Sequence, residues 1–397
     1  MGDPAGLSPA GLLIPPGITL CQPSGYDSEL PNGSRTGVVT MRSEARPLRR
    51  CTPFFLPLVA ALISLGCTQD ANEPSMSNAP DFGAAVEPPG LSAALAAQER
   101  HTDRLLGMPG VVGTAVGLGP GGRAAVQVFT RAADVVGLAA ALDGVPVAVV
   151  VTGEVRALPA SPANPEAAVT TPPFARSPRP VPIGISTGNE GSCSVGTIAA
   201  RVKLGSKVYA LSNNHIYALE NLAPIGSKTL QPGRYDLNCA VGVDAVLGPL
   251  TRFVPIVFSR TANNMVDAAI AASTTALLDR RTPPDGYGTP ARTPATPAIG
   301  MAVQKYGRTS GLTVGWVDGI NAEVLVVYSK GVTRFVDQVL VEGRVPFSRD
   351  GDSGSLIVTT AGRQPVALLF AGTSNGYTFA NPIGAVLKAF NVTIDGT

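Results

Sequence analysis

The residues with the clearest capacity for chemistry are one serine between glycines and two histidines. Ser353 lies in the run Gly-Asp-Ser-Gly at 351–354, and histidine occurs only at positions 101 and 215. A serine hydroxyl is a weak nucleophile until a positioned imidazole removes its proton. Any chemistry that pairs a serine with a histidine must therefore use His101 or His215.

His215 is placed where an imidazole could face a cleft. It follows the run Val-Tyr-Ala-Leu-Ser-Asn-Asn at 208–214, an apolar strand pattern that stops at polar residues. His101 falls on a predicted helix, where the simplest interpretation is a surface side chain. The sequence therefore favours His215 as the partner of Ser353.

A carboxylate is the expected third member, because it fixes the tautomer of the imidazole. Asp267 fits best. It lies in the apolar run 265–271, where a carboxylate is costly to bury unless a polar group such as an imidazole N–H compensates it. The alternative is an edge-strand aspartate facing water, and Asp236 and Asp244 are weaker candidates because they lie in loop-like sequence closer to His215.

These residues must be positioned by an all-β domain over residues 183–397. Its predicted strands are 197–202, 207–212, 266–271, 312–320, 322–328, 337–341, 355–358 and 366–371. A terminal helix is predicted over 383–390, because Asn381 could cap it and Pro382 could occupy its first turn.

Residues 41–67 are typical of an export signal. Arginines precede the apolar run 54–65, which is too short to span a bilayer, and Gly66 and Cys67 follow it. The segment resembles a bacterial lipoprotein signal, in which Cys67 would be acylated and become the first mature residue. An ordinary secretory signal is the alternative. Residues 1–40 are then interpreted as a mis-assigned start, with Met41 as the true one.

Between the signal and the all-β domain, the residue composition indicates three segments. Residues 68–87 are polar and small, as in a flexible tether, and residues 157–182 are a Pro-rich linker. Residues 88–156 predict a small α/β module, a sheet covered by two helices. Its elements are a helix over 91–106, strands over 110–118 and 124–129, a helix over 132–142 and a strand over 147–152.

Export would leave Cys193 and Cys239 as the free thiols of the mature chain, since Cys21 and Cys51 would be removed and Cys67 lipidated. In an oxidising compartment we expect these two to pair. His215 lies near the middle of the loop that they would close. Such a bridge would brace the segment that presents the imidazole, whereas two buried thiols are the alternative.

The order His215, Asp267, Ser353, with the Gly-Asp-Ser-Gly run, resembles the chymotrypsin/trypsin-type serine peptidases. Four further runs are similar to the narrow-leaf-type branch of plant trypsin-like proteins and its bacterial relatives. They are Ser-Asn-Asn-His at 212–215, Gln-Pro-Gly at 231–233, Val-Asp-Ala-Ala at 266–269 and Tyr-Gly-Arg-Thr at 306–309. The resemblance covers residues 183–397 and implies a mainly β fold, a chymotrypsin-like double β-barrel with a C-terminal helix.

By this resemblance, Ser353 would attack a carbonyl, His215 would serve as general base and then acid, and Asp267 would orient His215. The N–H groups of Gly351 and Ser353 would form the oxyanion hole. Asp352 would be held by a newly exposed N-terminus or by an arginine such as Arg308 or Arg349.

The resemblance also implies a specificity pocket. Its expected residues are Phe347, Ser348, Phe370, Ala371 and Gly372. With Phe-Ser where trypsins carry an acid, cleavage after Lys or Arg is not expected, and an apolar or small residue is favoured. The module at 88–156 resembles the pro-domains that precede exported proteases, which predicts a folding aid or inhibitor; a separate adhesion or spacing domain is the alternative.

Composition narrows the remaining possibilities. A net charge of +2 with 15% charged residues gives no electrostatic footprint for nucleic acid. The cysteine spacing shows no metal pattern, and no cofactor is expected. An α/β-hydrolase needs a histidine after its serine, and none follows Ser353. We therefore expect an exported serine endopeptidase acting on peptides or proteins, secreted or anchored to the cell envelope through Cys67, with a non-catalytic peptide-binding adaptor as the alternative.

Overall fold

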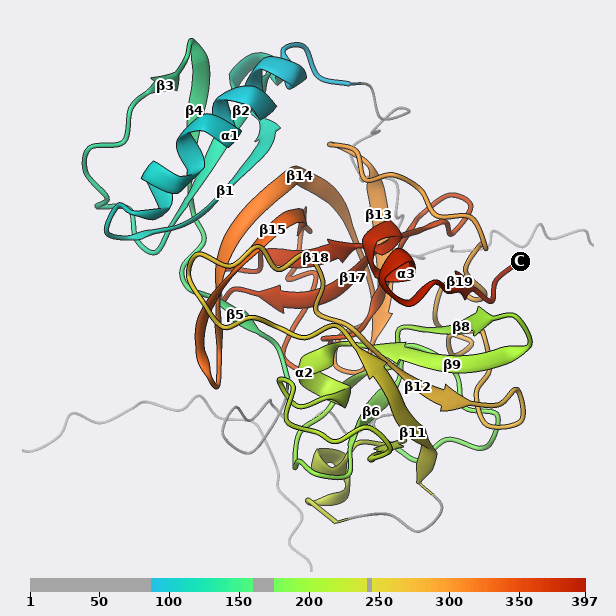
Figure 1. Cartoon of the computed structure of the whole chain (residues 1–397). Helices are drawn as coiled ribbons and strands as arrows, with labels where there is room; N and C mark the ends of the chain where they lie inside the picture. Colours follow the sequence, from blue (N-terminus) through green and yellow to red (C-terminus); the bar gives the residue numbers. More distant parts are fainter. Residues whose placement is uncertain (1–86, 160–174, 241–244) are drawn as a thin grey trace, which may run out of the picture. The chain divides into compact units, whose positions relative to one another are not determined.

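A computed structural model describes residues 87–159, 175–240 and 245–397, and this part of the chain is mainly β (Figure 1). Two sheets carry it, an 11-stranded one and an 8-stranded one. The mainly β class with a C-terminal helix, expected from the sequence, is confirmed. The predicted signal at 41–67, Cys67 and Asp244 lie outside the described residues.

The larger sheet contains a closed ring of six strands. The ring closes because β13 pairs with β14 as well as with β16. In ring order its strands are β13 (Ala302–Gly307), β16 (Leu356–Thr359), β17 (Pro365–Gly372), β18 (Thr378–Pro382), β15 (Gly331–Glu342) and β14 (Gly311–Tyr328). The apolar side chains that alternate inward along these strands form the barrel's own core, around Phe347 and Ile357.

The second sheet runs in the order β19-β8-β9-β12-β11-β10-β6-β7. Its members are β19 (Thr393–Ile394), β8 (Ala200–Leu204), β9 (Lys207–Ser212), β12 (Ala269–Ser273), β11 (Val246–Phe253), β10 (Lys228–Leu230), β6 (Ser186–Asn189) and β7 (Gly196–Thr197). Two short helical turns lie in its connections, α2 (Asn214–Tyr217) after β9 and η2 (Arg234–Leu237) after β10.

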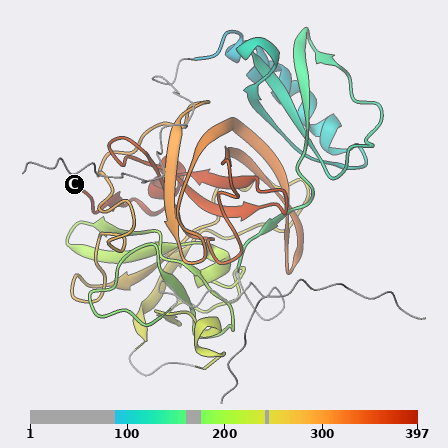
Figure 2. The same cartoon turned by 180° about the vertical axis from the view of Figure 1, so that it is seen from behind.

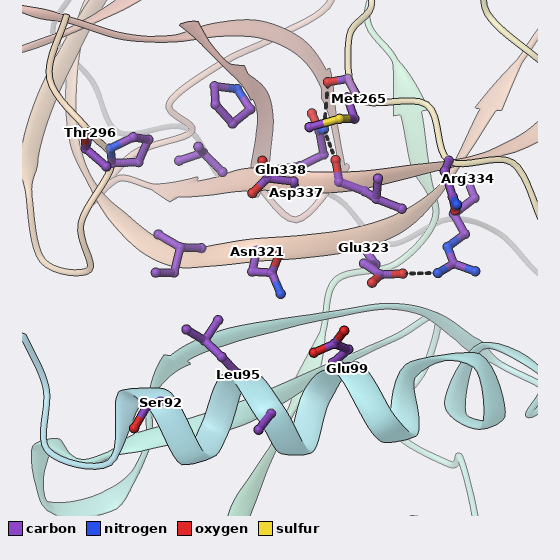
Figure 3. Close-up of a pocket in the computed structure, with 17 residues that line it drawn as sticks. Ser92, Leu95, Glu99, Met265, Thr296, Asn321, Glu323, Arg334, Asp337 and Gln338 are labelled. Carbon is purple, nitrogen blue, oxygen red and sulfur yellow. Dashed lines mark hydrogen bonds and ion pairs between the residues drawn. The ribbon is translucent and has the colours of Figure 1, made fainter. Parts of the chain in front are cut away.

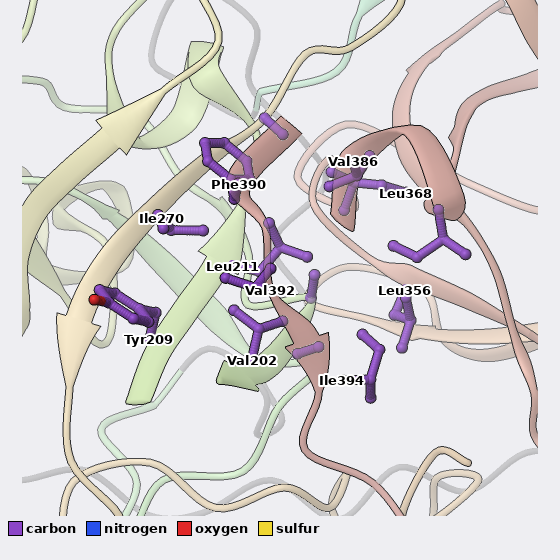
Figure 4. Packing of buried hydrophobic residues seen from close by; sticks show 14 of the residues in the cluster. Val202, Tyr209, Leu211, Ile270, Leu356, Leu368, Val386, Phe390, Val392 and Ile394 are labelled. Carbon is purple, nitrogen blue, oxygen red and sulfur yellow. The ribbon is translucent and has the colours of Figure 1, made fainter. Parts of the chain in front are cut away.

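One apolar cluster joins the two sheets. Leu211 and Ile270 from the smaller sheet pack in it with Leu356 and Leu368 from the barrel (Figure 4). Helix α3 (Ile383–Phe390) adds Ile383, Val386 and Phe390 to the same cluster. The helix has the predicted bounds. The prediction that Asn381 caps it is wrong, because Asn381 lies in β18 and no side chain caps α3.

The N-terminal module is continuous with the barrel. Its strand β1 (Val111–Leu118) pairs antiparallel with the middle of β14 on one side and with β2 (Ala124–Thr130) on the other (Figures 1 and 2). Strands β4 (Val145–Val151) and β3 (Ala141–Leu142) extend the sheet, and η1 (Pro120–Gly122) links β1 to β2. The long strand β14 therefore belongs both to the barrel ring and to the module's part of the same 11-stranded sheet.

A single helix covers the module's sheet. Helix α1 (Leu91–Leu106) has the predicted bounds and buries Ala94, Ala97 and Leu105. The second helix predicted over 132–142 is wrong. Gly137 takes a left-handed backbone angle, φ 82°, and the segment is a loop that ends in β3.

The predicted linker begins inside a strand. Strand β5 (Val155–Ala157) pairs in parallel with the end of β14 and antiparallel with β17. The chain that leaves the module therefore lies along the barrel before it reaches residues 160–174, which are outside the described part.

Candidate active site

His215 and Asp267 form a buried pair beside the ends of two neighbouring inner strands of the smaller sheet, β9 and β12. Nδ1 of His215 lies 2.5 Å from Oδ2 of Asp267, and the two side chains are 1% and 0% exposed. The backbone N–H of His215 donates to Oδ1 of the same carboxylate over 3.2 Å. The edge-strand, water-facing alternative for Asp267 is therefore wrong. The residue lies just before β12 rather than inside a strand.

Three more groups fix Asp267. The hydroxyl of Tyr328, at the end of β14, donates to Oδ2 over 2.7 Å. The Asp267 N–H donates to Oδ1 of Asn381, and Asn213 donates its side-chain N–H to the Asp267 carbonyl oxygen. The aspartate thus has partners from both sheets. Burial and the charge of Asp267 raise the pKa of Tyr328 well above its usual value, so the phenol keeps its proton as a donor.

Orientation by Asp267 leaves the other ring nitrogen of His215 available. With Nδ1 against the carboxylate, the proton of a neutral ring is held on Nδ1, and Nε2 carries the lone pair. Among the described residues, Nε2 is buried and has no hydrogen-bond partner. A buried nitrogen without a partner is the atom that a reactive hydroxyl or a leaving group would engage.

Ser353 lies on the barrel side of the same region. Its carbonyl oxygen accepts from Thr197 N over 2.7 Å, and its Oγ donates to the Phe370 carbonyl oxygen over 3.2 Å. Gly196 lies between Ser353 and Ile216, the residue after His215. A Cβ at position 196 would lie 2.7 Å from Ile216 Cδ1 and 2.8 Å from the Ser353 carbonyl oxygen. The residue after His215 and the main chain of Ser353 therefore flank one glycine.

The turn before Ser353 is built around Asp352. Its carboxylate is fully buried and accepts from the N–H groups of Thr309, Ser310 and Arg349. Lys305 Nζ, also 0% exposed, lies 3.4 Å from Oδ2. The counter-charge that was expected from an N-terminus or an arginine is therefore supplied by Lys305. Arg308 forms its ion pair with Asp236 instead, and Arg349 contributes its backbone N–H.

Gly351 presents a backbone donor next to the serine. Its φ of 94° is in the left-handed region that favours glycine, and its N–H points to the carbonyl oxygen of Leu158 over 2.7 Å. Leu158 N also lies 3.3 Å from Ser353 Oγ. A peptide carbonyl is therefore hydrogen-bonded at the expected position of an oxyanion hole. The structure shows no such bond from Ser353 N to Leu158.

The predicted pocket residues lie around that leucine. A Cβ at Gly372 would meet Leu158 Cδ1 at 2.8 Å and Ser348 Oγ at 3.5 Å. Ser348 Oγ pairs with Thr378 Oγ1 at 2.7 Å, so the pocket wall is neutral there. Phe347 shares a buried apolar cluster with Leu158, and Phe370 and Ala371 belong to β17.

The predicted disulfide between Cys193 and Cys239 is present, with the two Cα atoms 5.0 Å apart. It joins the loop after β6 to the chain after η2, on the sheet that carries His215. The nearby Asn189 donates to the carbonyl oxygen of Tyr217 in α2, which links this bridged region to the helix of His215.

A large pocket lies away from these residues. It has a volume of about 990 Å³ and lies among α1, β14 and β15, with Glu99, Asn321, Glu323 and Arg334 in its walls (Figure 3). None of His215, Asp267 and Ser353 lines it. His101 takes no part in the candidate site either, since its Nε2 pairs with Asp143 at 3.0 Å on the module.

The described residues contain no group of three or more His, Cys, Asp or Glu side chains able to hold a metal ion. No helix within them has the length and hydropathy needed to cross a membrane.

Residues 291–395 match the family model of the Nal1 C-terminal domain. The chain is also 38% identical over 89 residues to Protein NARROW LEAF 1 of Oryza sativa subsp. japonica, across 21% of this chain and 15% of that protein. The similarity to narrow-leaf-type proteins is thus shown for a segment that contains Ser353. His215 and Asp267 lie outside the residues matched by the family model.

Solved structures with a similar fold include serine proteases. Thermobifida fusca Protease A matches with 18% identity and a TM-score of 0.40, covering 55% of this chain and 100% of that one. The Cellulomonas bogoriensis chymotrypsin matches with 19% identity and a TM-score of 0.38, covering 55% and 99%. A glutamic acid specific serine protease matches with 22% identity and a TM-score of 0.38, covering 54% and 100%.

Three residues of this site were not predicted from the sequence. Tyr328 ends a strand-like run, Lys305 lies in a run too polar to be chosen as a strand, and Leu158 opens a Pro-rich segment. A lysine directly before Tyr-Gly-Arg-Thr was a usable signal, since a buried Asp352 needs a cation. Nothing local marks Tyr328 or Leu158, whose partners come from distant parts of the chain.

Proposed function

We propose that the chain is an exported serine endopeptidase. In the first half-reaction, Oγ of Ser353 attacks the carbonyl carbon of a peptide bond while Nε2 of His215 takes the hydroxyl proton. The C–N bond then breaks, the proton passes from His215 to the leaving amine, and an ester on Ser353 remains. Water, deprotonated by the same nitrogen, hydrolyses the ester and releases a carboxylic acid.

The contact that most supports this proposal is the hydrogen bond from Gly351 N–H to a peptide carbonyl oxygen beside Ser353. Such a donor stabilises negative charge on the oxygen in the tetrahedral intermediate and is worth about 3 kcal/mol of transition-state stabilisation. The His215–Asp267 pair supports the same chemistry, because it fixes the tautomer in which Nε2 is the base.

Export is part of the proposal. It rests on the signal-like pattern at 41–67 and on the disulfide between Cys193 and Cys239, a bond that persists in oxidising compartments. We expect the mature protein to be secreted, or held at the cell envelope by acylation of Cys67. Globomycin-sensitive processing with incorporation of labelled palmitate would identify the lipoprotein form, and Cys67→Ser should abolish both.

Labelling with a fluorophosphonate probe tests the catalytic assignment. The Leu158→Asp variant, in which removal of the leucine side chain is expected to open the cleft at Ser353, should bind the probe at that serine, and the full chain should bind it more slowly. Ser353→Ala and His215→Ala in either background should lose the label, whereas Ser206→Ala, in an exposed turn, should keep it. Absence of label from Ser353 in both backgrounds would contradict the peptidase proposal.

A non-catalytic peptide-binding adaptor is the second candidate. The observation that favours it is the pairing of β5 with β17, since strand addition binds peptides without any chemistry. If the chain were an adaptor, the wild type and the Ser353→Ala variant would bind peptides equally well, and neither would cleave any member of a peptide library.

A further inference from the structure

Residues 155–158 lie in the barrel as an extra strand. Ala157 is opposite Ala371 and Arg156 opposite Gly372, antiparallel to β17, while Val155 is opposite Val326 of β14. Val155 and Ala157 are buried with the exposed Arg156 between them, and Leu158 is 5% exposed. An extended peptide that pairs along a sheet edge and buries alternate side chains is the geometry of bound substrate in strand-addition recognition.

The main chain of Leu158 is held at the reacting atoms. Its carbonyl oxygen accepts from Gly351 N over 2.7 Å, and its N–H lies 3.3 Å from Ser353 Oγ. The segment therefore ends with one peptide carbonyl at the serine, and the next residue, Pro159, occupies the leaving-group side.

The side chain of Leu158 fills the specificity pocket. It lies in the buried cluster that includes Phe347, and its Cδ1 is against Gly372. A Cβ at position 372 would overlap Cδ1, so glycine is what leaves room for a side chain of this size. The neutral pair of Ser348 and Thr378 offers no counter-charge for a lysine or arginine.

Charged residues lie outside this apolar pocket. Glu154, Arg349 and Asp350 line a neighbouring cavity of about 580 Å³, and Leu158 forms part of its wall. Ser348 lines this cavity too, so the polar region adjoins the apolar pocket at Leu158 and Ser348.

We infer that residues Val155–Leu158 are an intramolecular pseudosubstrate that keeps the enzyme latent, and that the substrates carry an apolar side chain up to the size of leucine at the position of Leu158. This inference rests on the proposed peptidase function. Because the segment is tethered through β1 and β14, its effective concentration at the cleft is in the millimolar range, which a dilute substrate cannot match.

The sequence of the segment also explains why it occupies the cleft without being a good substrate. Proline follows Leu158, and its ring nitrogen carries no hydrogen and is held within the ring. Expulsion of that nitrogen from the tetrahedral intermediate therefore needs a different alignment from that of an ordinary amide. The Leu158–Pro159 bond remains intact, and release of the cleft requires displacement or removal of the module.

The decisive experiment compares the full chain with its Leu158→Asp variant on a peptide substrate, Ac-Val-Arg-Ala-Leu-Ser-Gly-NH₂. A carboxylate cannot enter the apolar pocket, so the variant should cleave after leucine about 100-fold faster than the wild type. Val149→Asp puts the same charge on an exposed position of the module and should leave the chain latent. Leu158→Ala is the second variant if the aspartate prevents folding, and circular dichroism reports the fold.

Two further measurements separate this inference from the proposed function. The peptide Ac-Val-Arg-Ala-Leu-OH should inhibit the Leu158→Asp variant competitively, and Ac-Val-Arg-Ala-Asp-OH should not. Replacement of the substrate leucine by lysine or glutamate should lower kcat/KM by at least about tenfold. Wild type and Leu158→Asp with equal activity would overturn the pseudosubstrate and leave the peptidase standing. A Ser353 that never labels in any background would overturn the peptidase itself.

Discussion

The phenol of Tyr328 donates to Oδ2 of Asp267 over 2.7 Å, the same oxygen that lies 2.5 Å from His215 Nδ1. The tyrosine comes from the barrel and the aspartate from the smaller sheet. The rings of Tyr328 and His215 also meet edge to face, with centroids 5.9 Å apart. Tyr328 therefore connects the barrel to Asp267, the residue that orients the imidazole of His215.

The first prediction concerns the hydroxyl of Tyr328. In the activated Leu158→Asp background, Tyr328→Phe keeps the ring and removes one hydrogen bond to a buried carboxylate. A hydrogen bond to a charged group is worth about 1.5–3 kcal/mol, so we expect kcat to fall by roughly ten- to a hundredfold. KM should stay within about twofold, because Tyr328 acts through Asp267 and has no bond to Leu158 in the cleft.

Tyr287→Phe is the matched control, since Tyr287 is a buried tyrosine in the cluster between the sheets and outside the Asp267 hydrogen bonds. Steady-state kinetics on one leucine peptide measures both variants. A KM that rises while kcat is unchanged would assign Tyr328 to substrate binding and contradict its positioning role.

The sequence predicted the elements whose pattern is local. Helices α1 and α3 and strand β9 have the expected bounds, because periodicity and length agreed at those positions. It divided β14 into two strands at Asn321, whose φ is 53°, whereas the structure continues the strand through an irregular register. The sheet pairing of β1 with β14 could not be predicted, since both segments have the pattern of ordinary strands.

The candidate site likewise combines residues that a local sequence pattern marks with residues that matter only through distant partners. Scarcity of histidine singled out His215, and an acid in an apolar run singled out Asp267. Tyr328 and Leu158 carry no such signal, because each matters only through a partner that the fold brings close. The type of a titratable residue can reveal its chemistry, whereas the role of a neutral residue is set by its contacts.

The second prediction concerns the buried pair of Lys305 and Asp352. Both side chains are 0% exposed, and burial lowers the pKa of Lys305 while Asp352 opposes that shift. Lys305→Met leaves a carboxylate buried with neutral donors only, which should cost about 3–5 kcal/mol of unfolding free energy. Urea unfolding measures this cost.

The double variant Lys305→Met/Asp352→Asn tests the origin of that loss. Removal of both charges should recover about half or more of the stability lost in Lys305→Met. Asp352→Asn alone is measured as well. If the loss in the double variant equalled the sum of the losses in the two single variants, the two residues would act independently, contrary to the ion pair in the structure.

The third prediction concerns alkaline stability. Burial raises the pKa of the Tyr217 and Tyr287 phenols above the usual range, and burial together with the charge of Asp267 raises that of Tyr328. In the unfolded chain these phenols ionise at about pH 10. Above that pH the unfolded state therefore binds fewer protons than the folded state, so the stabilisation present at lower pH is lost as the pH rises.

Each such tyrosine lowers the unfolding free energy by up to about 1.4 kcal/mol per pH unit above about pH 10. Lys305 acts in the opposite direction: its pKa is lowered by burial, so stability grows as the pH approaches the unfolded lysine's value. Lys305 is present in both the wild type and Tyr287→Phe, so its contribution cancels in the difference between their unfolding free energies. We expect their difference in unfolding free energy, from urea titrations between about pH 8 and 11.5, to be constant up to about pH 9.5 and then to shift in favour of the variant. A difference that stays constant over the whole range would show that the Tyr287 phenol ionises as readily in the folded protein as in the unfolded chain.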